Sequence, residues 1–427
     1  MKTFLFLSIV STFFLLHFEG ARTVFFGVPV YFVEIGVIAS TVGFFLIRKQ
    51  SKISFENTPS VETQNFVPLR KGIFFLLVGI VSSLIAATLP SAICPLSHEG
   101  LLRALGIVKS WFVFPIVFGY IFFHASHAYF SREKLILAFL ISFLPILILS
   151  FLGWLFGTGM TYDSRLSGIF NSPNILALHF TPAIILSWYF FRTSKFSILH
   201  SPLSILPRLF LFLLFLLFLT RSVSAWIAVG VGILFFEIMR TRIVRVGANN
   251  YSPLRHGRGY IAIFLVCTGI FFLSQWNNPR FENFFDPDSR SSFASRLMIW
   301  QSAGKMISDS PIFGIGPGNF GSCYLTYQQY FPPYLEWSVP EPHNIFLAFW
   351  LGSGLIGLLG FGFLVAWWFR NVFRRMQKEG DLLLLALAVI MIATLIHGFV
   401  DTPYWRLGLS YIFWVVFFLG IREKNDK

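Results

Sequence analysis

Long apolar runs recur from one end of the sequence to the other, each bounded by charged residues or by Pro and Gly. A hydrocarbon core of about 30 Å is crossed by about 20 apolar residues in a helix, and many of these runs approach that length. Of the 427 residues, 56% are hydrophobic and only 12% are charged, which is too apolar for a water-soluble fold. The sequence therefore predicts an all-α, polytopic integral membrane protein.

About twelve transmembrane helices are expected from these runs. They are predicted near Thr3–Phe18, Val24–Ile47, Gly72–Leu89, Ala104–Phe123, Leu135–Phe156, Asn174–Phe191, Leu206–Thr220, Ser222–Met239, Gly259–Trp276, Asn344–Phe369, Leu382–Val400 and Leu407–Ile421. The first run could instead be a signal peptide, although Glu19 fits poorly before a cleavage site at Ala21. In both cases the second helix starts on the outer side.

The net charge of +14 is explained by membrane topology. If the chain starts inside and alternates, most Lys and Arg residues fall on the cytoplasmic side, as in Arg48–Lys52, Arg240–Arg245 and Arg370–Lys378. We therefore expect both chain ends in the cytoplasm, membrane lipids as the surroundings and no nucleic-acid partner.

One long polar segment, residues 277–343, is predicted to lie outside the membrane. Within it, "SSFASRLMIWQSAGKMISDSP" predicts an amphipathic helix that starts at Ser292 or Ser295 and ends before Pro311. Its expected apolar stripe consists of Leu297, Trp300, Ala303, Met306 and Ile307. Such a helix could lie along the membrane surface. We divide the chain into helices at 1–204, a core at 205–369 that includes this outer loop, and helices at 370–427.

The stretch "FGIGPGNFG", Phe313–Gly321, is superficially like a phosphate-binding glycine loop. No βαβ unit surrounds it and it faces away from cytoplasmic nucleotides, so a tight turn is the better interpretation. Of the three cysteines, Cys94 and Cys323 both fall on the oxidising side, where one bridge could form.

Three arginines gather on the outer side without matching acids: Arg221, Arg165 and Arg296. Arg221, in "LFLTRSVSAWIAV", could anchor the chain at the interface or pair with Asp163. Arg296 could equally be an ordinary exposed helix residue. Taken together they indicate a site for an anionic ligand, because a guanidinium grips phosphate with two hydrogen bonds.

Polar residues near these arginines complete the candidate site. Asn171 and Asn174, in "GIFNSPN", could form only a turn and a helix cap, with the cap at Asn174.

His343 lies in "PEPHN" with Glu341 and Asn344 and could be a helix cap, but an imidazole facing water there also suits a general base. If His343 is structural, Glu341 is the next candidate for the base.

His397 and Asp401, in "HGFVD", are four residues apart at the outer end of a predicted helix and therefore on one face. We expect them to support the site. No metal-ligand motif is found, and no metal or other cofactor is expected.

The motifs "GIFNSPN", "LTRSVSAW", "SRLMIWQSA…SPIFGIGPGNF" and "PHNIFL…GSGLIGLLGF", in this order with a long outer loop, resemble the O-antigen ligase and polymerase superfamily. The resemblance is strongest from Phe210 to Phe363. It implies a metal-independent glycosyltransferase at the periplasmic face of the bacterial inner membrane. Its donor would be a glycan on undecaprenyl pyrophosphate, and its acceptor the lipid A core or another glycan.

The resemblance also implies roles for single residues. Arg221 and Arg296 match the arginines that bind the donor pyrophosphate, and His343 matches the histidine that deprotonates the acceptor hydroxyl. A polymerase of lipid-linked repeats is an open alternative to a ligase. A transporter or flippase of about twelve helices is an alternative of another class, but the two halves show no hydropathy repeat.

Overall fold

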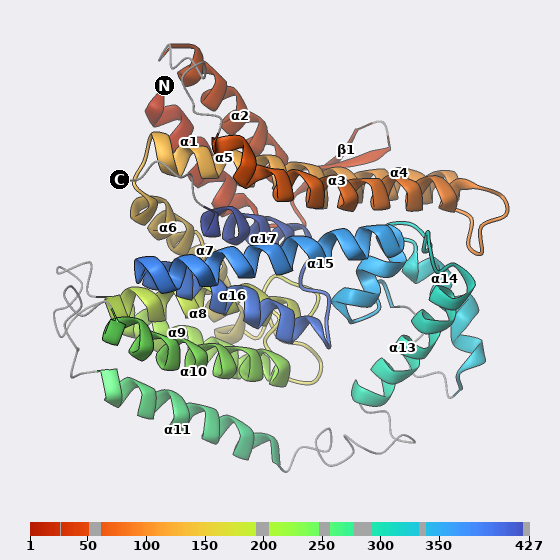
Figure 1. Cartoon of the computed structure of the whole chain (residues 1–427). Helices are drawn as coiled ribbons and strands as arrows, with labels where there is room; N and C mark the ends of the chain where they lie inside the picture. Colours follow the sequence, from red (N-terminus) through yellow and green to blue (C-terminus); the bar gives the residue numbers. More distant parts are fainter. Residues whose placement is uncertain are drawn as a thin grey trace. The chain divides into compact units, whose positions relative to one another are not determined.

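The computed structural model describes residues 1–25, 27–50, 61–193, 205–246, 257–276, 292–332 and 339–421. The chain forms two compact units. Unit 1 comprises Met1–Ala138, Pro287–Arg370 and Gly398–Lys427, and unit 2 comprises Phe139–Asp286 and Asn371–His397. Each is described by itself below, with the element labels of Figure 1.

The first part of unit 1 contains α1 (Lys2–Leu15), β1 (Arg22–Phe25), β2 (Val28–Tyr31), α2 (Phe32–Gln50), α3 (Val61–Thr88), α4 (His98–Ile107), the π-helical η2 (Val108–Val113), α5 (Phe114–Ala128) and most of α6 (Arg132–Ile141). It also contains α13 (Ser292–Asp309), α14 (Phe320–Tyr327), the 3₁₀ turn η4 (Gln328–Tyr330), α15 (Ile345–Glu379) as far as Arg370, and α17 (Leu407–Gly420).

Unit 2 contains α7 (Leu144–Leu155), α8 (Pro173–Thr193), α9 (Ile205–Thr220), α10 (Val223–Val246), α11 (Gly257–Trp276) and α16 (Leu382–Gly398) as far as His397. Helix α8 packs on α9 and α10 and is buried along almost its whole length.

Six helical stretches of the described chain are long and apolar enough to cross a membrane, and five shorter apolar helices accompany them. Helices occur at all twelve predicted positions, which confirms the all-α class. The number of membrane crossings stays a prediction. Several boundaries were wrong. The second helix begins at Phe32 rather than Val24, because β1 and β2 form an antiparallel hairpin before it. Gly27 has a φ of 78°, and Pro29 disfavours helix at the residue before it. Helix α3 begins at Val61 rather than Gly72, α15 continues to Glu379 rather than Phe369, and the helix predicted at Leu135–Phe156 is divided into α6 and α7.

Helix α15 is broken inside unit 1, at Gly354, where φ is 66°. The segment 312–321, called the glycine loop below, pairs with the backbone on both sides of the break. Leu355 N donates to Ile312 O at 2.9 Å, and Ile315 N donates to Leu351 O at 2.8 Å. A side chain at Gly354 would collide with the Ile312 carbonyl. The loop between α13 and α14 is therefore built into the start of α15.

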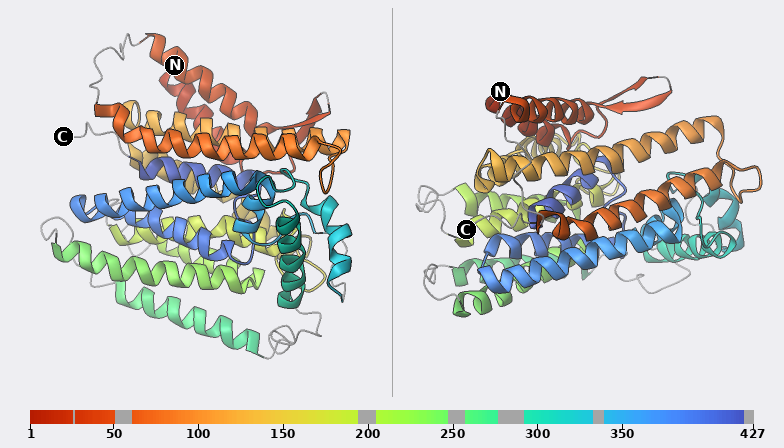
Figure 2. Two further views of the ribbon diagram at one scale, coloured as in Figure 1. Left: turned by 45° about the vertical axis from the view of Figure 1, so that its right-hand side comes forward. Right: turned by 45° about the horizontal axis from the view of Figure 1, so that its top comes forward.

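The unbroken part of α15 runs beside α3, and both views in Figure 2 show this pairing. A Cβ added at Gly79 of α3 would meet the backbone of Gly357, so the two helices approach closely because both positions are glycine. The glycine loop is also tied to α3, because Gly316 N donates to Ser83 Oγ at 3.1 Å.

Candidate functional site

In unit 1, the start of α15 presents His343 on a strained backbone. Its φ of 47° lies in the left-handed region, which non-glycine residues seldom adopt and which concentrates at functional sites. The helix cap is Asn344 instead, because its Oδ1 accepts from Phe346 N at 2.9 Å and from Leu347 N at 3.1 Å. The alternative that His343 caps the helix is therefore wrong, and its imidazole is available for another role.

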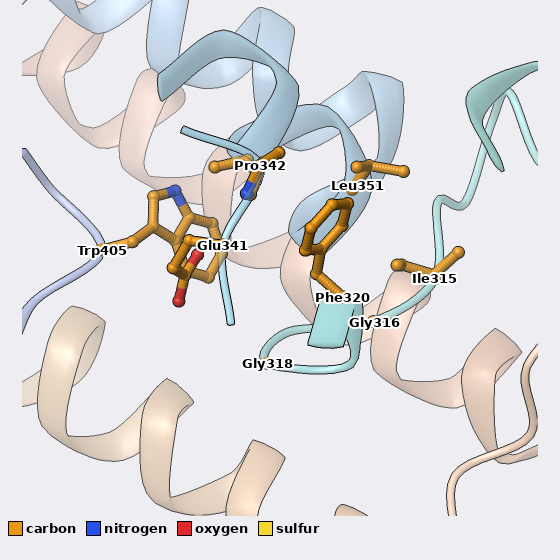
Figure 3. Close-up of a pocket in the computed structure, with 10 residues that line it drawn as sticks. Ile315, Gly316, Gly318, Phe320, Glu341, Pro342, Leu351 and Trp405 are labelled. Atoms are coloured by element: carbon orange, nitrogen blue, oxygen red, sulfur yellow. The ribbon is translucent and has the colours of Figure 1, made fainter. Parts of the chain in front are cut away.

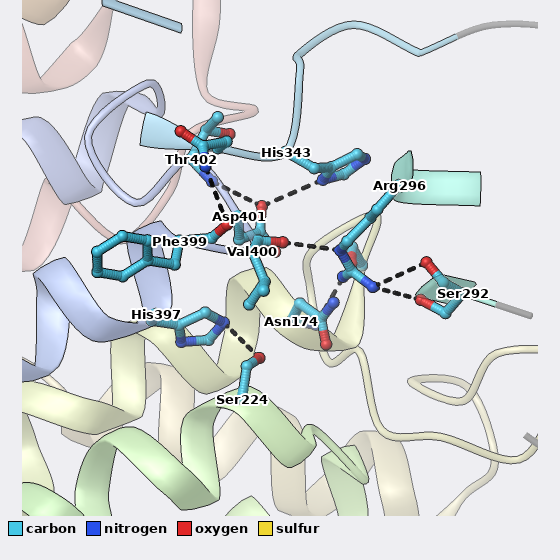
Figure 4. A network of polar contacts seen from close by, with 12 residues as sticks. Asn174, Ser224, Ser292, Arg296, His343, His397, Phe399, Val400, Asp401 and Thr402 are labelled. Atoms are coloured by element: carbon cyan, nitrogen blue, oxygen red, sulfur yellow. Dashed lines mark hydrogen bonds and ion pairs between the residues drawn. The ribbon is translucent and has the colours of Figure 1, made fainter. Parts of the chain in front are cut away.

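Asp401 lies beside that imidazole. Its Oδ1 is 3.4 Å from Nδ1 of His343, and the same oxygen accepts from Thr402 N at 2.8 Å (Figure 4). Asp401 is 8% exposed and His343 31% exposed as side chains. A carboxylate at Nδ1 favours the tautomer with its proton there, which leaves Nε2 as the basic nitrogen.

The expectation that His397 and Asp401 share one helix face was wrong. Helix α16 ends at Gly398, so Asp401 lies in the turn beyond it. In unit 2, His397 Nε2 instead contacts Ser224 Oγ of α10 at 2.9 Å. Residues four apart share a face only if the helix continues through both of them. Here the helix has ended before Asp401, and Pro403 disfavours helix at Thr402.

Arg296 of α13 holds the Asp401 turn from the other side. Its Nε donates to Val400 O at 2.8 Å, and its Nη1 donates to Ser292 O at 3.2 Å and to Ser292 Oγ. The neighbouring Trp300 donates from Nε1 to the His343 carbonyl at 3.3 Å. Helix α13 therefore contacts both chain segments that carry the histidine and the aspartate.

The predicted amphipathic helix is confirmed as α13, with a partly different apolar stripe. Ala303, Met306 and Ile307 are buried as expected, together with Met298 and Ile299, whereas Leu297 is exposed. The buried side chains of α13 pack against α14.

The Cys94–Cys323 disulfide forms, as considered from the sequence, with Cα atoms 5.8 Å apart. It joins α14 to the loop after α3. Asn319 Nδ2 adds hydrogen bonds to the carbonyls of Cys94, at 2.8 Å, and Ile315, at 3.0 Å. The glycine loop is a turn, as predicted, with positive φ at Gly314, Gly316 and Gly318.

In unit 2, the turn between α9 and α10 presents Arg221, which has a φ of 49° and is exposed. Its side chain makes no hydrogen bond or ion pair with the residues that the structure describes, so the pairing with Asp163 considered above is absent there. A guanidinium in this state can bind an incoming anion with its full set of donors.

Arg165 supports this turn. Its Nε donates to the Thr220 carbonyl at 2.8 Å, directly before Arg221, and its Nη2 donates to Asn174 Oδ1 at 2.9 Å. Asn174 therefore holds Arg165 and is not the predicted helix cap: α8 starts one residue earlier, and Ser172 Oγ accepts from Asn174 N at 3.3 Å.

Asn171 is exposed and makes no side-chain hydrogen bond within the described chain.

Glu341 lies in unit 1, two residues before His343, and is buried with 7% of its surface exposed. Burial raises the pKa of its carboxyl group to about 8; Arg406 opposes this rise and the Asp401 charge adds to it. At neutral pH Glu341 therefore holds its proton, which makes it a poor base there.

Several contacts of the site were missed from the sequence: the His343–Asp401 pair, and the bonds of Trp300, Ser292 and Ser224. Most of these contacts join residues that are far apart in the chain. Ser and Trp also occur in many structural roles, so no local sequence pattern indicates these contacts. No group of three His, Cys, Asp or Glu side chains that could hold a metal ion occurs in the described ranges.

The fold and these two sets of residues define a class: a polytopic membrane protein with a supported histidine in one unit and an exposed arginine turn in the other. Residues 209–362 match the family model described as O-antigen ligase. The match supports the O-antigen ligase and polymerase superfamily, as the sequence predicted, and includes Arg221, Arg296 and His343. No protein of curated function matches the chain.

Proposed function

We propose that the chain transfers a glycan from undecaprenyl pyrophosphate to an acceptor hydroxyl on the periplasmic face of the inner membrane, as an O-antigen ligase with a lipid A core acceptor. The family match supports glycosyl transfer of this general type. The observation that carries the proposal is the imidazole of His343, which is 31% exposed and held at Nδ1 by Asp401.

In this reaction Nε2 of His343 takes the proton of the acceptor hydroxyl as its oxygen bonds to the donor sugar. The bond from that sugar to the pyrophosphate breaks, and its electron pair leaves with the phosphate oxygen. Arg221 stabilises the negative charge that develops there, so the activated donor needs no nucleotide. Arg296 is proposed to donate its remaining N–H groups to the pyrophosphate. Arg165 and Asn174 are proposed to hold the Arg221 turn. Asn171, Asn344 and His397 are proposed to support substrate binding.

The topology is supported by two observations. The Lys and Arg excess on the other set of loops favours an outer location for the segment that ends at His343. Cys94 and Cys323 both lie in segments expected on the outer side, and a disulfide between them suits an oxidising compartment.

The test is deletion in a bacterium that carries the gene, followed by analysis of its surface and lipid-linked glycans. A ligase leaves the core bare while polymer accumulates on the lipid carrier. Single repeats attached to the core would instead identify a polymerase, and unchanged glycan with altered export of another anion would identify a transporter. Plasmid copies of the parent and of His343→Ala provide the positive and negative controls.

We also propose that transfer is independent of metal ions, because arginine can supply the positive charge at the leaving group. Purified enzyme should keep its rate in EDTA. Loss of transfer that Mg²⁺ or Mn²⁺ restores would contradict this part of the proposal.

A further inference from the structure

A pocket of unit 1 lies directly beside the candidate base and has no role in the mechanism above. Figure 3 shows its lining, which comes from the glycine loop, α14, the start of α15 and the segment before α17. The pocket opens to solvent, and its empty volume of about 230 Å³ includes that opening. The lining residues are Ile315, Gly316, Gly318, Phe320, Glu341, Pro342, Ala348, Leu351, Gly352 and Trp405. The space left between the lining side chains has room for about one water-sized group, so the pocket suits a single hydroxyl of a larger molecule that extends out of it.

Glu341 provides the only titratable side chain of that lining. The carboxyl group lies beside the Trp405 ring in Figure 3. It makes no hydrogen bond to the residues that the structure describes, although Glu341 is more than nine-tenths buried. The carboxyl oxygens are not among the fully enclosed unpaired atoms, so they are reached from the pocket, where a ligand group can pair with them.

We propose that this pocket is a subsite for the acceptor saccharide, in which Glu341 forms a hydrogen bond with one of its hydroxyl groups. The inference rests on the proposed function and adds a residue that selects the acceptor. The Cα atoms of Glu341 and His343 lie at most about 7 Å apart, so the pocket and the candidate base are neighbours along the chain.

The charges around Glu341 favour a neutral ligand over the donor pyrophosphate. Arg406 and Asp401 are the charged groups that act on its carboxyl, and the remaining lining is apolar or backbone. Burial raises the pKa of Glu341 to about 8, so the group at neutral pH is a carboxylic acid that can both donate and accept. A sugar hydroxyl has the same two capacities.

The variants that test this are Glu341→Ala and Glu341→Gln, in purified full-length protein, with rough lipopolysaccharide as the acceptor probe. Glu341→Ala should raise the acceptor KM about tenfold or more, with donor-lipid binding unchanged. Glu341→Gln should restore the acceptor KM to within about threefold, because an amide replaces the neutral acid. The matched control is Glu19→Gln: Glu19 is a half-buried acid near Arg406, but it accepts from Gly408 N at 3.0 Å and does not line the pocket. Its acceptor KM should equal that of the parent.

Alkaline pH adds a second readout. Parent activity should fall as pH rises through about 8, because Glu341 ionises beside Asp401, and Glu341→Gln should lose this decline. An unchanged acceptor KM in Glu341→Ala, or a Glu341→Gln variant as defective as Ala, would overturn the subsite.

A readout without activity separates this inference from the proposed function. Dicyclohexylcarbodiimide modifies protonated acids in apolar surroundings, and mass spectrometry locates the product. Glu341 should react at pH 6.5, and rough lipopolysaccharide should protect it while the donor lipid does not. Protection by neither ligand, or by the donor alone, would exclude the subsite, as would a failure to react. If acceptor protection persists but His343→Ala retains full transfer, the assigned base is wrong and the subsite stands.

Discussion

The turn at Arg221 and the turn at His343 share a backbone feature and differ in what their side chains contact. Among the described residues only three that are not glycine have positive φ: Ser164, Arg221 and His343. The Arg221 side chain has no partner there, whereas the imidazole of His343 faces Asp401. A free guanidinium suits the binding of an incoming anion, and an oriented imidazole suits the removal of a proton.

Each of the two turns is supported by a second arginine. Arg165 supports the Arg221 turn through the Thr220 carbonyl, and Arg296 supports the His343–Asp401 pair through the Val400 carbonyl. The three arginines that looked equivalent in the sequence therefore differ: one is exposed and two already hold neighbouring backbone. If this comparison is right, substitutions at the two turns should affect binding and chemistry differently.

The largest effect is expected for His343→Ala, which should lower the transfer rate by about 10²- to 10⁴-fold while the donor lipid still binds. The base acts only as the new bond forms, so ground-state binding of the donor does not depend on it. Rates and donor binding are measured on one preparation. His98→Ala, an exposed histidine at the start of α4, is the control. A large loss of donor binding in His343→Ala would erase the difference between the two turns.

Removal of the disulfide by a Cys94→Ser, Cys323→Ser double variant should destabilise unit 1 by about 2–4 kcal/mol. Thermal unfolding in detergent measures this, with Cys267→Ser as the control because that cysteine is unbridged. Donor binding at the Arg221 turn should be retained below the melting temperature. Free thiols at both positions in the parent, isolated from cells without reductant, would contradict the outer topology.

Arg221→Ala should weaken donor-lipid binding by about 10- to 100-fold, because hydrogen bonds to a charged group contribute about 1.5–3 kcal/mol. Arg221→Lys should recover only part of this, since an ammonium group cannot make the two-pronged contact. Equilibrium binding of the donor lipid is the measurement, and Arg103→Ala, exposed on α4, is the control. Unchanged donor affinity would assign Arg221 to interfacial anchoring.

The smallest effect is expected for Arg296→Lys, which should lower kcat by about 2- to 10-fold, the size of one net hydrogen bond. Loss of the bond to Val400 would loosen the turn that carries Asp401, so kcat should change more than donor affinity. If donor affinity falls as far as in Arg221→Lys, the pyrophosphate contacts of Arg296 outweigh its support of the Asp401 turn, and the contrast between the two turns disappears.

The sequence by itself predicted the all-α membrane class and the approximate positions of the helices, because hydropathy and charge act over short stretches of chain. It also identified Arg221, Arg296 and His343 as candidates. Local signals misled where tertiary contacts intervened: α2 starts late because a hairpin precedes it, and Asp401 leaves the face of His397 because α16 ends at Gly398.

Only the tertiary structure decided which polar groups meet. His343 and Asp401 are 58 residues apart, and Arg296 and Val400 are 104 apart, so no periodic pattern links them. The same holds for the surroundings of Glu341, whose pocket is lined by Gly316 and Gly318 of the glycine loop and by Trp405. A pKa raised to about 8 follows from removing that carboxyl from water, a property of its surroundings that its neighbours in sequence do not encode.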